Sequence, residues 1–264
     1  MHESEVIRLA QGCLTKVMKE TARRCGGVSL EERGLLLVAG NHPCPVFVNS
    51  ALRTGSMEAM EVLRLTSAFF AARGHHCEMW VRDGADADLD KAAIAAGMRV
   101  AVELSGMAVH KSPGLPEPRP GVEIRRVEDI EGLRDFTNVV AQGFRDDAPS
   151  LSDLVRSIFS EPGSIIAPDT AAFVVWDHGE PSSAAMTMVK NEVAWIGWVA
   201  TLPEARGRGL GRMATAAATR AGFMLGARFA SLEATKMGVP VYVRLGYREV
   251  QRYRTYWSAD YVVG

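Results

Sequence analysis

The chain has 264 residues, of which 47% are hydrophobic and 23% charged, and its 30 Lys and Arg balance 31 Asp and Glu. This composition is ordinary for a soluble globular protein and excludes a coiled coil, long disorder and a disulfide scaffold. There is no basic excess and no apolar run of about 18 residues, so we expect neither nucleic-acid binding nor membrane association. The four cysteines form no CxxC pair, which indicates a reducing compartment and a cytoplasmic protein.

A proline-rich segment divides the chain into two halves. Residues 112–121 hold four of the 12 prolines and are unsuited to a helix interior or a central strand. They are typical of a stiff extended linker. The sequence therefore predicts one domain over 1–111, a linker over 112–121 and a second domain over 122–264.

Periodicity and turn residues predict the elements. In the first half they indicate a strand-to-helix turn over 51–58, a helix over 56–72 and a strand over 76–82. The second half reads as strands over 122–127, 170–176, 183–190, 192–200, 228–233 and 249–256, with helices over 129–143, 151–160, 210–225 and 239–245. This order predicts an α/β protein, or more strictly an α+β one, with a mixed sheet flanked by helices.

The first half repeats the end of this pattern. Residues 92–99 match residues 241–248 at a constant offset of 149. Upstream, the helix over 56–72, Gly74 and the next strand match the helix over 210–225, Gly226 and the strand that follows it. Internal repetition of this kind predicts one fold used twice in tandem.

The second half contains a glycine-rich turn between a strand and a helix. Its glycines, Gly207, Gly209 and Gly211, alternate with Arg206, Arg208 and Arg212, flanking Leu210. Uncovered backbone N–H groups at a helix N-terminus, surrounded by positive charge, form a site for a phosphate or pyrophosphate. The spacing matches neither the dinucleotide fingerprint nor a P-loop.

This turn resembles the pyrophosphate loop of the GNAT superfamily of acyl-CoA N-acyltransferases, which reads Arg/Gln-x-x-Gly-x-Gly/Ala. The preceding strand with its proline, residues 199–203, resembles the family as well, and so does the segment 240–247, with its Tyr-x-x-x-Gly-aromatic helix end. The resemblance covers the whole second half and implies a GNAT fold there. In the first half it depends on the repeat alone.

The resemblance implies that acetyl-CoA, as co-substrate, lies between two parallel strands that separate, here 192–200 and 228–233. The pantetheine arm would pair with the backbone of Val199, Ala200 and Thr201. The pyrophosphate would contact the N–H groups of Gly207, Arg208, Gly209, Leu210, Gly211 and Arg212. The reaction implied is direct attack by a primary amine on the thioester, with an N–H near Val199 stabilising the oxyanion.

Two further residues take part in the implied chemistry. Tyr242 matches the family's usual acid, which protonates the departing thiolate. Glu233, at the end of a strand beside the acyl site, is a candidate base for the amine proton. The segment Glu233–Gly238 lacks the Asn often found before this helix in the family, which puts one cofactor contact in doubt.

The acceptor is not readable beyond a small-molecule or peptide amine, and we allow for a homodimer. Asp146 and Asp147 could hold an ammonium or form a solvated loop, and Trp198 could line the acceptor site or pack in the core. Two alternatives stay open: a catalytically inactive acyl-CoA-binding sensor or scaffold, and an acyltransferase with a different acyl donor or a small-thiol pathway amine as acceptor.

No metal site is expected. Neighbouring residues of the cluster His75-His76-Cys77-Glu78 would point to opposite faces of a strand. The acidic run Asp86-x-Asp88-x-Asp90 lacks the glycine and glutamate of a calcium loop and instead indicates a helix N-terminus. In the first half, the turn over 51–58 has a single glycine and Ala93 stands where Tyr242 stands in the second. We therefore expect a degenerate copy that packs against the active domain and could wall its acceptor site.

Overall fold

The computed structural model describes residues 1–144, 149–259 and 261. The first half contains α1 (Glu3–Arg24), β1 (Val28–Glu32), β2 (Leu35–Ala39), β3 (Asn49–Arg53), α2 (Ala59–Ala71), β4 (Glu78–Arg82), α3 (Ala87–Ala95) and β5 (Arg99–Val109). The second half contains β6 (Val122–Arg126), α4 (Ile130–Gly143), α5 (Pro149–Ile158), β7 (Thr170–Asp177), β8 (Glu180–Lys190), β9 (Val193–Thr201), α6 (Leu210–Met224), β10 (Phe229–Thr235), α7 (Val239–Val243) and β11 (Arg248–Trp257), with short 3₁₀ turns at Pro162–Ser164 and Pro203–Ala205.

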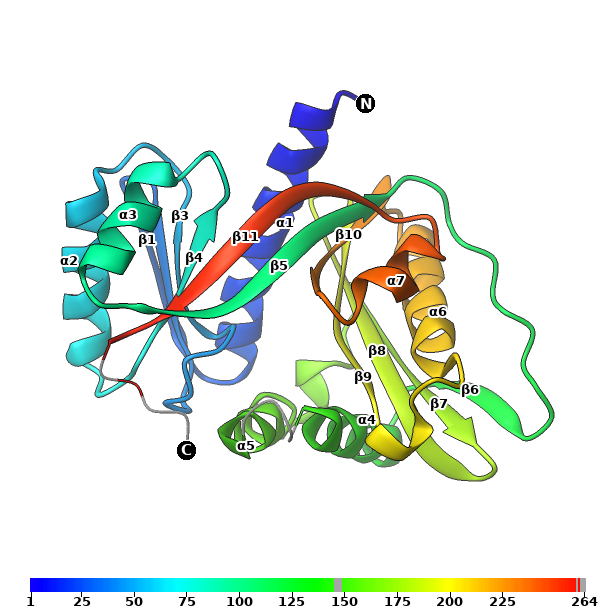
Figure 1. The fold of residues 1–264 in the computed structure, drawn as a ribbon. Helices are drawn as coiled ribbons and strands as arrows, with labels where there is room; N and C mark the ends of the chain where they lie inside the picture. The colour runs from blue at the N-terminus through cyan, green and yellow to red at the C-terminus, as the bar shows by residue number, and fades with distance from the viewer. Residues whose placement is uncertain (145–148, 260, 262–264) are drawn as a thin grey trace.

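All eleven strands belong to one mixed sheet in which the halves exchange their last strands. The order is β1-β2-β3-β4-β11-β5-β10-β9-β8-β7-β6. Strand β5 pairs antiparallel with β10 and β11, both from the second half, whereas β11 pairs antiparallel with β4 and β5, both from the first. Figure 1 shows β5 and β11 running side by side across the middle of the molecule. Each half is therefore completed by a strand of the other.

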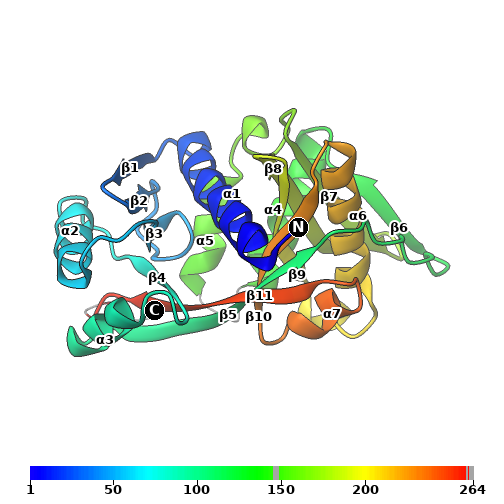
Figure 2. The same ribbon diagram turned by 90° about the horizontal axis from the view of Figure 1, so that it is seen from above.

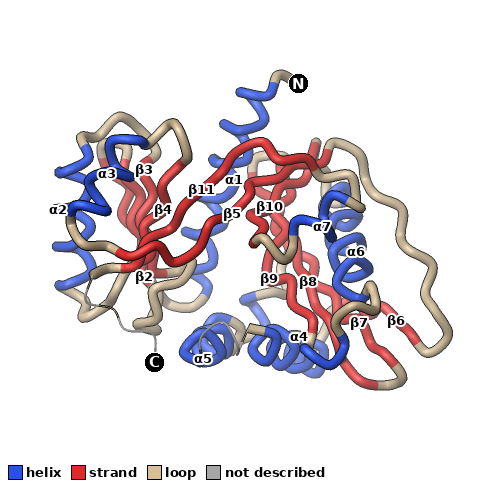
Figure 3. The backbone as a smooth tube through the Cα atoms, in the orientation of Figure 1, coloured by secondary structure: helices blue, strands red, loops and turns tan. Residues whose placement is uncertain are grey.

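The helices cover the sheet in two layers. In the second half α6 and α7 lie on one face, and α4 and α5 lie on the other (Figure 3). Helix α6 approaches the sheet closely, because a Cβ at Gly222 would lie 2.4 Å from the Cβ of Ala194 on β9. In the first half α2 and α3 cover one face, and α1 covers the other. One core cluster takes apolar residues from both halves, including Leu36 and Trp80 as well as Phe136 and Trp195.

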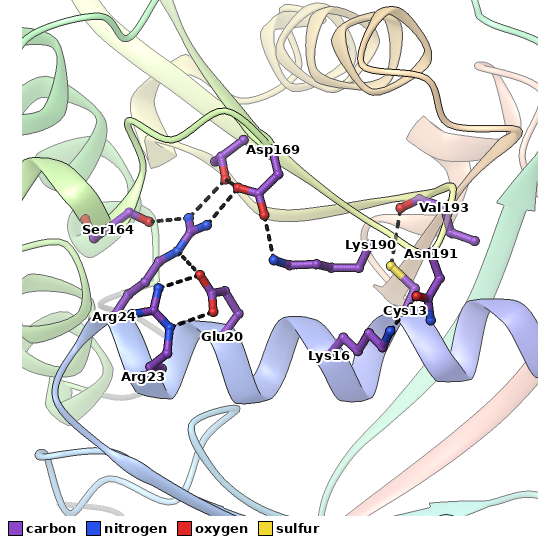
Figure 4. A network of polar contacts seen from close by, with 11 residues as sticks. Cys13, Lys16, Glu20, Arg23, Arg24, Ser164, Asp169, Lys190, Asn191 and Val193 are labelled. Carbon is purple, nitrogen blue, oxygen red and sulfur yellow. Dashed lines mark hydrogen bonds and ion pairs between the residues drawn. The ribbon is translucent and has the colours of Figure 1, made fainter.

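Helix α1 lies between the two halves (Figure 2) and forms hydrogen bonds and an ion pair with residues of the second half. Its apolar stripe places Val6, Cys13 and Val17 in the shared core. Arg24, whose side chain is buried, donates to the carboxylate of Asp169 at 2.8 Å, and Lys190 donates to the same carboxylate at 2.6 Å (Figure 4). Burial opposes ionisation, but Lys190 and Arg24 together hold the pKa of Asp169 down to about 2. These contacts attach α1 to the strand ends of the second half.

The internal repeat is visible in the backbone. Gly97 and Gly246, 149 residues apart, both have positive φ, +73° and +88°. Both end a short helix with the same pair of hydrogen bonds: the glycine N–H donates three residues back, and the next N–H donates five residues back. Each helix is followed by an exchanged strand, β5 or β11. Ala93 and Tyr242 are the equivalent buried residues of these two helices.

The predicted order of elements in the second half is confirmed, and the mixed α/β sheet with it. Two boundaries in the first half were wrong by two or three residues. The helix begins at Ala59, because the carboxylate of Glu58 caps it by accepting from the N–H of Glu61 at 3.1 Å. The strand predicted over 76–82 begins at Glu78, so His75 and His76 precede it. None of the helices in the described part of the chain combines the length and apolar character needed to cross a membrane.

The exchanged strands predict how the chain responds to cleavage in its linker. A protease site placed within residues 112–121, once cut, should leave the two fragments together as one particle by size-exclusion chromatography, because β5 and β11 each have partners only in the other half. Unfolding of the cut protein should depend on concentration, since refolding becomes bimolecular. Fragments that separate without denaturant, each with its own cooperative melt, would contradict this arrangement.

Candidate active site

The sheet opens between β9 and β10. These parallel strands pair only at Val193–Trp195 and Phe229–Ser231. Beyond this point β9 continues to Thr201 alongside β8, whereas β10 continues to Thr235 alongside β5. The edge of β9 that faces β10 thus has no partner strand over residues 196–201. Backbone groups left without a partner strand can pair with an extended ligand as an added strand does.

Six consecutive backbone N–H groups are available where β9 leads into α6. Residues 207–212 donate no hydrogen bond to any backbone or side-chain acceptor among the described residues, and the first helical bond is donated by Met213 to the carbonyl of Gly209. N–H groups in the first turn of a helix have no intrahelical acceptor, and together with the helix dipole they attract anions. This loop can therefore hold a phosphate or pyrophosphate.

The three glycines of this loop have two different roles. Gly207 and Gly209 have φ of +77° and +82°, a conformation that residues with side chains rarely adopt, and the space around them is open. Gly211 is required by packing instead, because a Cβ there would lie 2.9 Å from Oγ1 of Thr201. The first two glycines thus allow the backbone conformation of the loop, and the third allows the loop to pack closely against the end of β9.

The arginines of the loop have unequal environments. Arg208 directs its guanidinium to Asp177 at 2.7 Å, and its carbonyl accepts a bond from Arg119 of the linker at 2.8 Å. Arg206 donates to the carbonyls of Thr201 and Gly143, which ties the loop to the end of α4. Arg212 is exposed, with no ion pair within the described residues. Arg208 therefore offers its backbone N–H to a ligand, and its side chain lies elsewhere.

A β-bulge places two tryptophans on the same face of β9. Ala185 of β8 stands opposite both Trp198 and Val199, and Trp198 has φ of +51°. In a regular strand residues three apart point to opposite faces, yet Trp195 and Trp198 both contact the ring of Phe47, at 5.2 and 5.5 Å between centroids. The half-buried Trp198 also meets Phe144 and Phe159 edge-on, which encloses the face toward α4 and α5.

Glu233 lies on this same face, on β10, two residues beyond the last residue that pairs with β9. Its Oε2 accepts a 2.8 Å hydrogen bond from Nε1 of Trp195, and the indole of Trp195 folds back over Gly197. Burial raises the pKa of Glu233 to about 7, and the hydrogen bond from Trp195 offsets part of that rise. A carboxylate with this pKa exchanges a proton near neutral pH. Sequence reasoning named Glu233 but missed its partner Trp195.

Tyr242 lies on the opposite face of the sheet. Its ring packs with Tyr247 in the core under α6, together with Leu232 and Ala234, the neighbours of Glu233 along β10. Burial raises the pKa of Tyr242 to about 12, so its phenol stays protonated at neutral pH. No hydrogen-bond partner of its hydroxyl occurs among the described residues. Glu233 and the protonated phenol of Tyr242 therefore lie on opposite faces of the sheet.

The equivalent region of the first half is occupied by the chain itself. Gly209 is the N-cap residue of α6, and Glu58 is the N-cap residue of α2. The carboxylate of Glu58 already caps its helix. The buried Arg53, at the end of β3, donates to Asp86, to Asp88 and to the carbonyl of Met57. Asp88 lies in the first turn of α3, as the acidic run predicted. A guanidinium and a carboxylate thus fill the place where the second half leaves open backbone donors.

The predicted cofactor residues lie together along this gap. Val199, Ala200 and Thr201 form the end of β9 that pairs with β8 on one edge and faces the gap on the other, and the carbonyl of Ala200 accepts from the hydroxyl of Ser183 at 2.7 Å. Residues 207–212 follow directly. Asp146 and Asp147, considered for the acceptor, lie outside the described residues. Within the described part of the chain, no group of three or more His, Cys, Asp or Glu side chains is arranged to hold a metal ion.

Comparison with known proteins agrees with this geometry. Residues 136–247 match the sequence model of the acetyltransferase (GNAT) family. A search of curated proteins found no match. Residues 136–247 thus form a GNAT acetyltransferase family domain, and this family consists of acyltransferases.

Solved structures extend the likeness to the whole chain. A GCN5-related N-acetyltransferase from Kribbella flavida superposes with a TM-score of 0.71 at 19% identity, over 92% of this chain and 95% of its own. A conserved protein of unknown function from Staphylococcus epidermidis gives 0.70 at 16% identity, over 89% and 95%. A tandem GNAT protein from the clavulanic acid biosynthesis pathway gives 0.55 at 14% identity, over 84% and 77%. At these identities the likeness establishes the fold, in accordance with two tandem copies.

Two glycines at opposite ends of α6 allow a matched test of the anion site. We expect Gly209→Asp to weaken acetyl-CoA binding by about tenfold or more, since the new carboxylate fills the open loop and repels the pyrophosphate. Gly226→Asp is the control, because Gly226 also has positive φ, +94°, and open space around it but lies beyond the helix C-terminus. Calorimetric titration would show equal affinities if the phosphates bind elsewhere.

Proposed function

We propose that the protein transfers the acetyl group of acetyl-CoA to a primary amine by direct attack, with the working site in residues 122–264. The observation that carries this proposal is the opening between β9 and β10, which ends at six backbone donors that have no acceptor among the described residues. An extended amide-containing arm and a pyrophosphate are the chemistry that such a gap and loop would hold. The acceptor is a small-molecule or peptide amine, and no metal takes part.

The two faces of the gap suggest how protons move. Glu233, on the side of α4 and α5, takes a proton from the incoming ammonium, and the amine nitrogen then bonds to the thioester carbon. Backbone N–H groups near Val199 stabilise the oxyanion of the tetrahedral intermediate. When the carbon–sulfur bond breaks, Tyr242 on the other face donates its proton to the thiolate. The nitrogen loses its second proton as the amide forms, and proton exchange with water returns the phenolate of Tyr242 and the protonated Glu233 to their starting states. The products are an N-acetylated amine and free CoA.

The alternatives make different predictions for the full chain. An inactive sensor or scaffold would bind acyl-CoA without releasing thiol in the presence of any amine. An acyltransferase with another donor would release thiol from longer acyl-CoA esters in preference to acetyl-CoA. Calorimetric titration with acetyl-CoA, followed by thiol release from a series of acyl-CoA esters with an amine panel, separates the three. If acetyl-CoA fails to bind at millimolar concentration, the cofactor assignment is wrong.

Removing the hydroxyl of Tyr242 tests the acid. We expect Tyr242→Phe to lower kcat by roughly 10- to 100-fold, the lower part of the range for general acid catalysis, because a thiolate is a good leaving group. Affinity for acetyl-CoA should change little. Tyr247→Phe is the matched control: its hydroxyl bonds Thr219 at 2.7 Å, so its loss should cost about 1 kcal/mol of stability and leave kcat intact.

The pKa of Glu233 predicts the pH profile. A base must be deprotonated to act, so kcat/KM should rise as pH rises through about 7 and level off above it. The variant Glu233→Gln should lose this inflection and show a kcat lower by roughly 10²-fold or more. An unchanged profile in Glu233→Gln would assign the inflection to the substrate amine, leaving water as the base.

A further inference from the structure

A residue of the first half packs against the two tryptophans of β9, on the face of the sheet where the proposed base Glu233 lies. Phe47, in the segment between β2 and β3, stacks on Trp195 with an interplanar angle of 25° and meets Trp198 edge-on at 78°. Trp195 in turn holds the carboxylate of Glu233. Phe47 is thus one contact away from the proposed base and touches the tryptophan of the bulge, although it precedes Trp198 by 151 residues and Glu233 by 186.

The backbone of Phe47 is held in a conformation that costs energy. Its φ is +49°, which is uncommon for any residue other than glycine and a genuine outlier for a bulky side chain. Its N–H donates at 3.0 Å to Oε2 of Glu78, a buried carboxylate that also accepts from Nε1 of Trp80 at 3.1 Å. Strained backbone persists where surrounding structure determines it, and it concentrates at functional sites.

The segment around Phe47 is fixed at further points. The buried side chain of Asn49 donates to the carbonyls of His42 and Cys44, both at 2.6 Å, and accepts from the N–H of Gly40 at 3.1 Å. Nε1 of Trp257, at the end of β11, donates to the carbonyl of Pro45 at 3.0 Å. Phe47 is therefore presented to the second half on a rigid support, as a binding site requires.

The same face limits the chemistry of the acceptor. The rings of Phe47, Trp195, Trp198, Phe144 and Phe159 supply apolar surface there. Among the described residues, the carboxylate of Glu233 forms no ion pair with a Lys or Arg, and its side-chain hydrogen bond comes from Trp195. An acceptor with its own carboxylate next to the amine would place that charge near Glu233 without a described cation to neutralise it.

We propose that Phe47 forms one wall of the amine site, that Glu78 is the positioning residue that holds it there, and that the acceptor carries its amine on a flat or apolar frame without an acidic group. This inference rests on the proposed function. It assigns to the first half a direct part in acceptor recognition.

The test uses the full chain with two matched amines, phenethylamine and phenylalanine, which differ by the carboxylate alone. We expect kcat/KM for phenethylamine to exceed that for phenylalanine by at least about tenfold. Phe47→Leu should raise the KM for phenethylamine by about tenfold, on the scale of one lost aromatic contact, with kcat and the KM for acetyl-CoA nearly unchanged. Phe70→Leu, the same substitution at a buried phenylalanine of α2 in a separate core cluster, is the control and should change neither KM.

Glu78 is tested by rescue. Glu78→Ala should raise the acceptor KM as Phe47→Leu does, whereas Glu78→Gln should restore most of it, because the amide oxygen can still accept from the N–H of Phe47. Equal acceptor KM values in Phe47→Leu and Phe70→Leu, or a preference for phenylalanine, would overturn the inference. If acetyl-CoA binds but phenethylamine neither quenches tryptophan fluorescence nor releases thiol, this inference alone fails. If acetyl-CoA does not bind, the proposed function fails first.

Discussion

The pairing of β10 with β5 is the interaction on which the rest of the structure depends. Beyond Ser231, β10 leaves β9 and keeps only the strand supplied by the first half. The separation leaves the edge of β9 over residues 196–201 without the partner strand that a continuous sheet would give it. Backbone groups left without partners cost free energy, so β10 needs a partner strand on its other edge when it leaves β9. The exchanged strand is that partner and fixes the width at which the gap is held.

The gap also separates two kinds of chemistry by sheet alternation. Successive residues of β10 point to opposite faces, so Glu233 lies on the face that α1, α4 and α5 cover, near Cys13 of α1, whereas Leu232 and Ala234 face the core that holds Tyr242. A proton acceptor and a proton donor can then act on one thioester without meeting each other. Burial raises both pKa values, with different consequences. The pKa of the Glu233 carboxyl comes close to neutral pH, whereas the pKa of the Tyr242 phenol moves further above it.

The sequence was most informative where local chemistry decides the structure. The glycine-rich turn, the order of elements in the second half and the equivalence of Ala93 with Tyr242 depend on short-range patterns, and the structure has the same order and the same equivalent helix ends. No element was predicted over α1, although its apolar spacing from Val6 through Met18 is that of an amphipathic helix. The strand exchange, the bulge at Trp198 and the bond from Trp195 to Glu233 depend on contacts between distant residues, which periodicity does not encode.

The two repeats differ in what stands at the start of the helix after the strand-to-helix turn. At the start of α2, Glu58 supplies a negative charge and Arg53 fills the space beside it. At the start of α6, Gly209 has no side chain, so a negative charge there would have to come from a ligand. An internal carboxylate at this position stabilises the helix at all times, and an open glycine leaves it to be stabilised only by a bound anion. The first half therefore fills this position with its own side chains, whereas the second leaves it open to a ligand. The same half supplies β5 to the edge of β10 and Phe47 to the tryptophans.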